Sequence, residues 1–452
     1  MPGASLSRWT LAYFAAALLC LLAAEALMAG GFGFPAAAIE AGETLIVVHL
    51  VAIGWLSLLM AGALFQFVPV LVARPLQGEV LSPIALLLLL AGLAALLAGF
   101  ADMAGITRIS PALLPLGGTL LLAGFTAMIV SLGQTLWSAR PLALPARLVV
   151  AGLCALALTV GLGESFALIL SGLLGGEAAL SLLLHGIPLH ALLGLGGWLT
   201  LTAMGVSYRL LAMFMLAPET ERASTRIVFA AGILALLLIA AAIPFAMAAS
   251  LGVVGLMLAA AVAGLVALAL YGNDVLVLYR QRKRRNIELN ARAAIGAFAA
   301  LLGAAILLVL LLASGQLSAK VGALAYLFAF GWLGGLGLAM LYKIVAFLTW
   351  LECFAPVMGK RPTPRVQDLV DESRAAPWFG AYYAAVGFAT LTLLVELPVA
   401  FRLFVGVQFV ATLAIARHYY RSRQLLNVPA ELRRDFARPH PFLPQPVARK
   451  LP

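Results

Sequence analysis

The sequence predicts an all-α polytopic membrane protein: a helix bundle of about twelve transmembrane helices in three pseudo-repeated four-helix units, with both termini cytoplasmic. Three observations lead to this prediction: the composition, a succession of apolar runs, and a motif that occurs three times. The chain of 452 residues is 64% hydrophobic and only 10% charged, whereas soluble domains average about 45–50% apolar and about 25% charged residues. A soluble core cannot hide this excess, so most of the chain must face lipid.

Apolar runs follow one another along the whole chain, and a membrane span needs roughly 20 such residues. The runs lie at 8–33, 43–73, 82–101, 112–137, 146–174, 182–215, 226–248, 251–279, 291–314, 320–350, 377–398 and 400–421. The first run is too long for the apolar region of a signal peptide, so we assign it as the first helix. Residues 1–421 are therefore predicted to form the membrane bundle, and residues 422–452 a short, basic, proline-containing cytoplasmic tail.

Lysine and arginine residues predict the orientation of the bundle by the positive-inside rule. They concentrate in the loops on one side, whereas the opposite loops hold little beyond Arg108, Lys320 and Arg402. This places both termini in the cytoplasm. The net charge of +11 is then explained by membrane topology, which predicts the lipid bilayer as a partner and no nucleic acid.

A Gly-Trp-Leu motif recurs in the second, sixth and tenth runs, four predicted helices apart. Its copies begin at Gly54-Trp55, Gly197-Trp198 and Gly331-Trp332. A polar residue follows each copy near the end of the run, and these aligned residues are Gln66, Arg209 and Lys343. The spacing indicates three four-helix units around a pseudo-threefold axis.

His49 and His190 lie about a turn or two inside the second and sixth runs. A buried imidazole in lipid is costly without a partner, so each is a candidate ligand. Gly194 and Gly197 follow His190 on the same helical face. They could open a slot for a planar cofactor, or they could simply allow close helix packing, and both interpretations remain open. His185 is expected on the entry loop before this helix.

Carboxyl groups are sparse in the predicted membrane segments. Glu164 lies well inside the fifth run and is a candidate functional or histidine-pairing acid, whereas Glu25 and Glu396 lie near span ends, where wet positions suffice. Glu164 with Gln66, Arg209 and Lys343 could line a polar pathway. Alternatively, Arg209 and Lys343 extend to the cytoplasmic interface with their charged heads in water.

The segment from His49 to Trp55 and the segment from His190 to Trp198 resemble the haem-binding helices of haem-copper oxidase subunit I. The closest likeness is to the branch of cbb3-type oxidases and nitric oxide reductases, and to the related NnrS-like proteins. In that family a histidine at the start of helix two ligates the low-spin haem, and His49 matches it. His190 matches the first histidine of the helix-ten His-x-His pair, although it lies in the sixth run and Leu192 occupies the second position.

The resemblance implies a multi-pass protein of the bacterial inner membrane that binds at most one haem b, near the periplasmic side, through His49 and/or His190. Electron transfer, gas sensing or a nitrosative-stress response would be its role, and other respiratory or denitrification membrane proteins its partners. The tenth run has Tyr326 where a ligand would align, and the seventh run has no His-His pair. Copper and a complete terminal oxidase are therefore not expected. The alternative is a cofactor-free transporter, or an assembly or partner subunit of a respiratory complex; whether the chain is an enzyme stays open.

Overall fold

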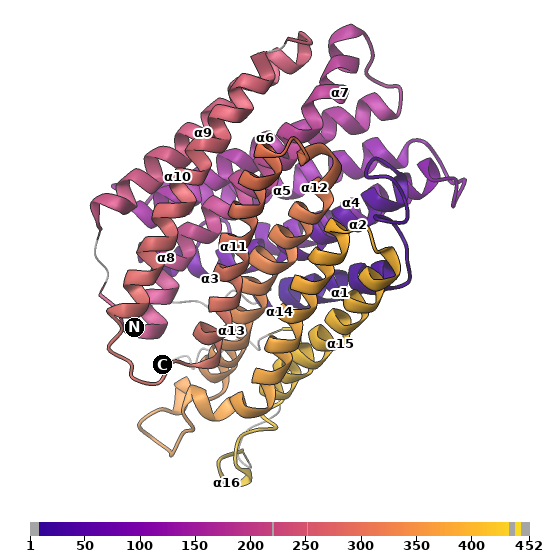
Figure 1. Ribbon diagram of the computed structural model, residues 1–452. Helices are drawn as coiled ribbons and strands as arrows, with labels where there is room; N and C mark the ends of the chain where they lie inside the picture. Colours follow the sequence, from indigo (N-terminus) through magenta and orange to yellow (C-terminus); the bar gives the residue numbers. More distant parts are fainter. Residues whose placement is uncertain (1–8, 219–220, 251, 434–438, 444–452) are drawn as a thin grey trace. The chain divides into compact units, whose positions relative to one another are not determined.

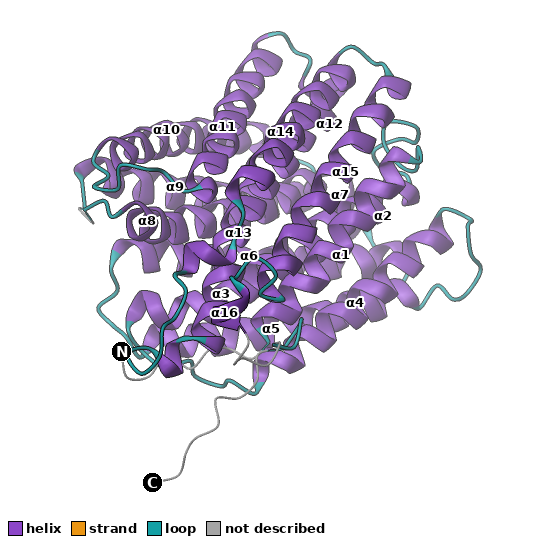
Figure 2. Cartoon of the chain, turned by 90° about the horizontal axis from the view of Figure 1, so that it is seen from below, coloured by secondary structure: helices purple, strands orange, loops and turns teal. Residues whose placement is uncertain are grey.

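A computed structural model describes residues 9–218, 221–250, 252–433 and 439–443. Over these residues the chain forms helices and loops without strands, as Figure 2 shows. Eleven of the described segments are helical, long and apolar enough to cross a membrane. They are Thr10–Ala29, Gly42–Val72, Leu81–Met103, Leu113–Trp137, Leu144–Leu170, Glu177–Met215, Ala223–Met247, Gly252–Arg280, Leu289–Ala313, Leu317–Cys353 and Pro398–Arg423. The chain is thus a multi-pass membrane protein, since helices satisfy their own backbone hydrogen bonds in lipid.

The helices fall into two compact units. The first unit comprises the described residues of 1–36, 61–66 and 287–452, and the second unit those of 37–60 and 67–286. The single helix α3 (Leu58–Val72) supplies residues to both.

The second unit holds the two predicted histidine ligands. Its further elements are α2 (Gly42–His49), η1 (Leu50–Ser57), α4 (Leu81–Met103), α5 (Leu113–Trp137), α6 (Leu144–Leu170), α7 (Glu177–Ala191), η2 (Leu192–Leu201), α8 (Thr202–Met215), α9 (Ala223–Met247) and α10 (Gly252–Arg280). Glycines allow close helix packing within it: a Cβ on Gly92 of α4 would lie 2.8 Å from the backbone nitrogen of Leu121 of α5.

The first unit joins the beginning of the chain to its last third. Its elements are α1 (Thr10–Ala29), α11 (Leu289–Ala313), α12 (Leu317–Tyr326), η3 (Leu327–Gly334), α13 (Gly335–Cys353), the 3-10 turns η4 (Ala355–Val357) and η5 (Val366–Leu369), α14 (Glu372–Leu394), α15 (Pro398–Arg423) and α16 (Ala430–Arg433). The first and last long helices pack side by side, indigo and yellow in Figure 1. Arg402 of α15 donates hydrogen bonds to the carbonyl oxygens of Ala29 and Gly30.

Each Gly-Trp-Leu copy lies in a π-helical segment, η1, η2 or η3. The tryptophans Trp55, Trp198 and Trp332 are all buried. π-Helical turns are rare in proteins, and those that occur are often found at functional sites. His49 and Tyr326 immediately precede η1 and η3, and His190 lies two positions before the start of η2. The motif therefore has a common local structure, while the arrangement of three four-helix units stays a prediction.

Helix α14 corresponds to the predicted run 377–398 but is not among the eleven apolar segments, and it carries polar side chains among its apolar ones. It nevertheless runs alongside α11 over a similar length. At its start Glu372 pairs with Arg292 of α11, with 3.1 Å between Nη2 and Oε2. Just beyond its end Glu396 pairs with Lys320, which follows the end of α11.

The predicted boundary of the tail at residue 422 falls inside α15, which continues to Arg423. Arg423 is buried and pairs with Glu352 of α13 at 2.5 Å between Nη1 and Oε2. It also donates two hydrogen bonds to the carbonyl oxygen of His440, at 2.9 and 2.7 Å. Leu425 and Val428 are buried against the same unit, so the described part of the tail packs onto the bundle.

Candidate functional site

His49 is the last residue of α2, in the second unit, and its imidazole is held by its own helix. The Nδ1 atom lies 2.8 Å from the carbonyl oxygen of Leu45, one turn earlier. The ring packs against Phe100 of α4, with 4.9 Å between the ring centroids. The residue is half-buried, and its ring is held from two sides, by the carbonyl oxygen of Leu45 and by Phe100.

His190 lies near the end of α7 and is held by a neighbouring helix. Its Nδ1 atom lies 3.0 Å from the carbonyl oxygen of Thr159 on α6, and Phe166 of α6 contacts the ring edge-on at 5.7 Å between centroids. Gly163 makes room for the imidazole, because a Cβ there would lie 3.1 Å from Cε1 of His190.

Both histidines are therefore fixed in the same tautomer. A carbonyl oxygen can only accept a hydrogen bond, so Nδ1 carries the proton in each ring and donates it. Nε2 is then left with its lone pair in the neutral ring, and neither Nε2 has a hydrogen-bond partner among the residues that the structure describes. Metal-ligating histidines commonly have this arrangement, with the second nitrogen bound to a carbonyl or carboxylate.

The structure brings the two histidines into one neighbourhood. The π-helical segments η1 and η2 that follow them pack against each other, and Trp198 Nε1 donates a hydrogen bond to Ser57 Oγ at 3.0 Å. His49 and His190 are also near enough that a positive charge on one ring would act on the other. The sequence alone did not show that spans two and six are neighbours.

The two glycines after His190 differ in what they do. A Cβ on Gly197 would lie 2.6 Å from the Cβ of Ala155 on α6, so this glycine serves close helix packing. At Gly194 the nearest atom is Thr159 Cγ2 at an ordinary contact distance of 3.4 Å. Packing thus accounts for one glycine, and the space at the other would accept a small side chain.

Glu164 does not pair with either histidine in the described part of the chain. Its Oε1 accepts a hydrogen bond from Thr119 of α5 at 2.9 Å. Its Oε2 is buried without a hydrogen-bond partner and lies over Gly118, where a Cβ would be only 2.0 Å away. The orienting acceptors of the histidines are instead backbone carbonyls, which the sequence could not identify.

The remaining predicted pathway residues are divided between the two units. Glu164 and Arg209 belong to the second unit, Gln66 and Lys343 to the first. Lys343 forms a largely buried ion pair with Glu288, with 2.7 Å between Nζ and Oε2. The pair holds Lys343 at the start of α11, which Glu288 directly precedes, and whether Lys343 lies at the cytoplasmic interface stays a prediction.

The predicted placement of His185 on an entry loop is wrong. Helix α7 begins at Glu177, so both His185 and Pro188 lie inside the helix and not at its entry. The His185 side chain is exposed, and its Nδ1 lies 3.0 Å from the carbonyl oxygen of Ser181. His185 thus makes the same kind of Nδ1–carbonyl hydrogen bond as His190 on the same helix. Unlike His190, it is exposed.

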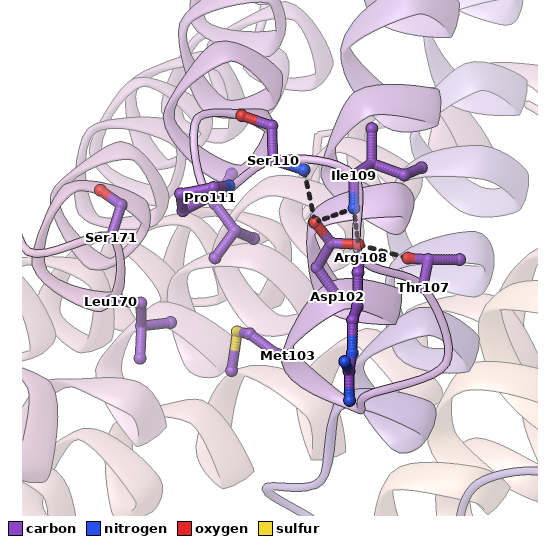
Figure 3. Close-up of a pocket in the computed structure, with 11 residues that line it drawn as sticks. Asp102, Met103, Thr107, Arg108, Ile109, Ser110, Pro111, Leu170 and Ser171 are labelled. Atoms are coloured by element: carbon purple, nitrogen blue, oxygen red, sulfur yellow. Dashed lines mark hydrogen bonds between the residues drawn. The ribbon is translucent and has the colours of Figure 1, made fainter.

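A surface pocket of about 450 Å³ lies beside the loop between α4 and α5. Figure 3 shows that the carboxylate of Asp102, which lines the pocket, is already hydrogen-bonded to this loop. Its carboxylate accepts hydrogen bonds from the Thr107 hydroxyl, from the Ile109 nitrogen at 3.0 and 3.1 Å, and from the Ser110 nitrogen at 2.8 Å. The Asp102 carboxylate stabilises the conformation of the loop and has no free hydrogen-bonding role. This pocket is therefore a weaker candidate site than the histidines.

In the part of the chain that the structure describes, no group of three or more His, Cys, Asp or Glu side chains converges to hold a metal ion. A haem needs fewer protein ligands, because the porphyrin supplies four nitrogens and the protein one or two axial ligands. The donor set of two neutral imidazoles fits that requirement. No family model matches this sequence, and no curated protein is detectably similar to it.

Proposed function

We propose that this chain is a haem-copper oxidase subunit I-like membrane protein that holds one haem b through His49 and His190. It acts in electron transfer, gas sensing or a nitrosative-stress response, and not as a complete oxidase. The observation that carries the proposal is the shared tautomer: both rings donate from Nδ1 to a carbonyl oxygen, which leaves Nε2 of each free to bind iron.

The protein's own contribution is to orient these two nitrogens before the haem arrives. Leu45 and Thr159 fix the rings through backbone carbonyls, and Phe100 and Phe166 pack against them. A bound haem b would supply one-electron redox chemistry or a gas-binding iron. Which of these it supplies depends on whether both imidazoles bind the iron or only one does.

The same proposal includes twelve spans with both termini in the cytoplasm of a bacterium, arranged as three four-helix units. The support for twelve spans is that α14 extends as far as its neighbour α11. The ion pairs Arg292–Glu372 and Lys320–Glu396 show that α14 runs from the start of α11 to beyond its end. A helix as deep as a membrane-spanning neighbour crosses the membrane with it, and an even number of spans brings the termini to one side.

An optical spectrum of the purified protein, oxidised and dithionite-reduced, tests the haem proposal together with a pyridine haemochrome assay. We expect a stoichiometric b-type signal that is six-coordinate, low-spin and unreactive with carbon monoxide. His49→Ala and His190→Ala should each abolish it or convert it to a five-coordinate form that binds carbon monoxide. His185→Ala, on the same helix and with the same kind of Nδ1 bond, is the matched control and should leave the spectrum unchanged.

Other outcomes are equally informative. A wild-type spectrum that is already five-coordinate, and sensitive to only one of the two variants, would replace shared ligation by a single axial histidine and favour gas sensing. A colourless, folded protein would contradict haem binding. The transporter alternative would then gain weight, and the buried, unpartnered Oε2 of Glu164 would be the first position to change in an uptake assay.

A further inference from the structure

Glu25 is the most deeply buried carboxyl group among the described residues of the first unit. It lies in α1 with a solvent-exposed fraction of 0%, although its place near a predicted span end suggested a wet position. No lysine, arginine or histidine pairs with it in the described part of the chain. The charge of an ionised Glu25 would therefore have no compensating cation.

The two oxygens of the Glu25 carboxyl group have different surroundings. Oε1 accepts hydrogen bonds from Gln408 Nε2 at 2.7 Å and from Thr412 Oγ1 at 3.0 Å, both on α15. Oε2 is buried without any hydrogen-bond partner. The Gln408 amide is itself oriented by the hydroxyl of Tyr326, which donates to its Oε1 atom. The donors are thus all directed at one oxygen, and the other is left alone.

This asymmetry matches a neutral carboxylic acid better than a carboxylate. In the acid, Oε1 is the carbonyl oxygen that accepts two hydrogen bonds, and Oε2 carries the proton. An unpaired carboxylate in an apolar interior is so costly that such a group normally keeps its proton instead. The phenols of Tyr326 and Tyr382 lie near enough to be affected by a charge on Glu25, but they supply no compensating cation, because phenols are uncharged near neutral pH.

We propose that Glu25 is a proton-binding site of the first unit, which carries a proton on Oε2 at neutral pH and exchanges it with water. No acceptor among the described residues holds the Oε2 proton, so no hydrogen bond has to break before it leaves. Gln408 connects Glu25 to Tyr326 by hydrogen bonds. Tyr326 precedes η3, just as His49 and His190 precede η1 and η2. The third motif copy thus serves a proton site, and the inference does not depend on haem binding.

Infrared spectroscopy of the full-length protein in detergent at pH 7 tests the proposal. The spectrum of the wild type minus that of Glu25→Gln should contain the carbonyl-stretch band of one protonated carboxyl group. Transfer to heavy water should shift this band to lower frequency, because the proton is replaced by a deuteron. Glu396→Gln, which removes an exposed carboxylate paired with Lys320, is the control and should not change the band.

A third variant tests the assignment of the two oxygens. Thr412→Val removes one hydrogen bond to Oε1 and should move the carbonyl band to higher frequency, with the protein still folded. Absence of a protonated-carboxyl band at pH 7 would overturn the proposal, since Glu25 would then be ionised. A band that does not shift after prolonged incubation in heavy water would also overturn it, because Glu25 would be a permanently neutral structural group.

Discussion

Trp198 donates a hydrogen bond from its buried indole nitrogen to the hydroxyl oxygen of Ser57, at 3.0 Å. The bond joins the π-helical segments η1 and η2 just inside the two candidate ligands. Ser57 also donates to the carbonyl oxygen of Ala52 at 2.7 Å, and Thr200 donates to that of Leu195 at the same distance. Hydroxyl groups thus bond to carbonyl oxygens five residues back in both segments, the same spacing as the backbone hydrogen bonds of a π-helix.

Replacement of Ser57 by alanine should destabilise the second unit. It leaves the buried indole N–H of Trp198 without its acceptor, and an unsatisfied buried donor costs about 1–3 kcal/mol. We expect a lower midpoint of thermal unfolding in detergent. Thr200→Val is the matched control, because it removes the same kind of hydroxyl–carbonyl bond without depriving an indole. Equal losses in the two variants would show that the Trp198–Ser57 bond adds nothing.

Gly163→Ala should lower the haem content of the purified protein, if the proposed ligation is right. The new Cβ would lie 3.1 Å from Cε1 of His190, so the ring must shift, and Nε2 with it. Gly161→Ala lies on the same helix with nothing within 4 Å of its new Cβ and is the control. Both changes raise helix propensity alike by about 1 kcal/mol, so a difference in haem stoichiometry reports on His190 alone.

Lys343→Met should destabilise the first unit, because the largely buried carboxylate of Glu288 would lose the cation that lies 2.7 Å from its Oε2. Removal of one partner from a buried ion pair typically costs about 3–5 kcal/mol. The double variant Lys343→Met with Glu288→Gln should recover much of that loss in the same denaturation assay. A single variant as stable as the wild type would mean that Lys343 is not held by this pair and could serve a pathway.

Reporter fusions to the loop after α14 and to the end of α15 should decide the number of spans. If α14 crosses the membrane, a reporter active only in the periplasm should work near Glu396 and fail after Arg423. A reporter active only in the cytoplasm should give the reverse. The reversed pattern, with the periplasmic reporter failing near Glu396 and working after Arg423, would place both ends of α14 in the cytoplasm and leave eleven spans.

Asp371 should stabilise the start of α14 at neutral pH and lose this effect in acid. Hydrogen bonds from the Ser373 hydroxyl and the Arg374 nitrogen lower the pKa of its carboxyl group below the ordinary value of 3.8. A carboxylate with a lowered pKa stabilises the fold above its unfolded pKa, and the stabilisation disappears as the pH falls through the folded pKa.

Hydrogen exchange in the first turn of α14 measures this effect. Asp371→Ala should increase exchange at pH 7, corresponding to at most about 1 kcal/mol for an exposed cap, and the difference from wild type should shrink at pH 3. Asp371→Asn keeps a neutral cap and should show little pH dependence over the same range. A difference that is unchanged at pH 3 would contradict a role for the ionised carboxylate.

Composition and apolar length were sufficient to predict the membrane fold, because lipid imposes one requirement on every span. They placed the α14 segment correctly as a helix but could not show that it runs beside α11. The candidate ligands His49 and His190 were visible as ionisable residues in apolar runs. Their partners were not, because any residue has a backbone carbonyl, and only the fold brings that of Thr159 to His190. Glu25 was misjudged for a related reason: its partners lie nearly the whole chain away.

The contact between α1 and α15 determines when during synthesis the first unit can fold. Glu25 enters the membrane with the first helix, but Gln408 follows 383 residues later. Glu352 likewise precedes Arg423, the cation that neutralises it. The first unit therefore cannot close during most of synthesis, and α1 must wait in the bilayer with Glu25 lacking its hydrogen-bond donors. Insertion machinery or a chaperone that shelters α1 until the last helix arrives would thus govern the yield of folded protein.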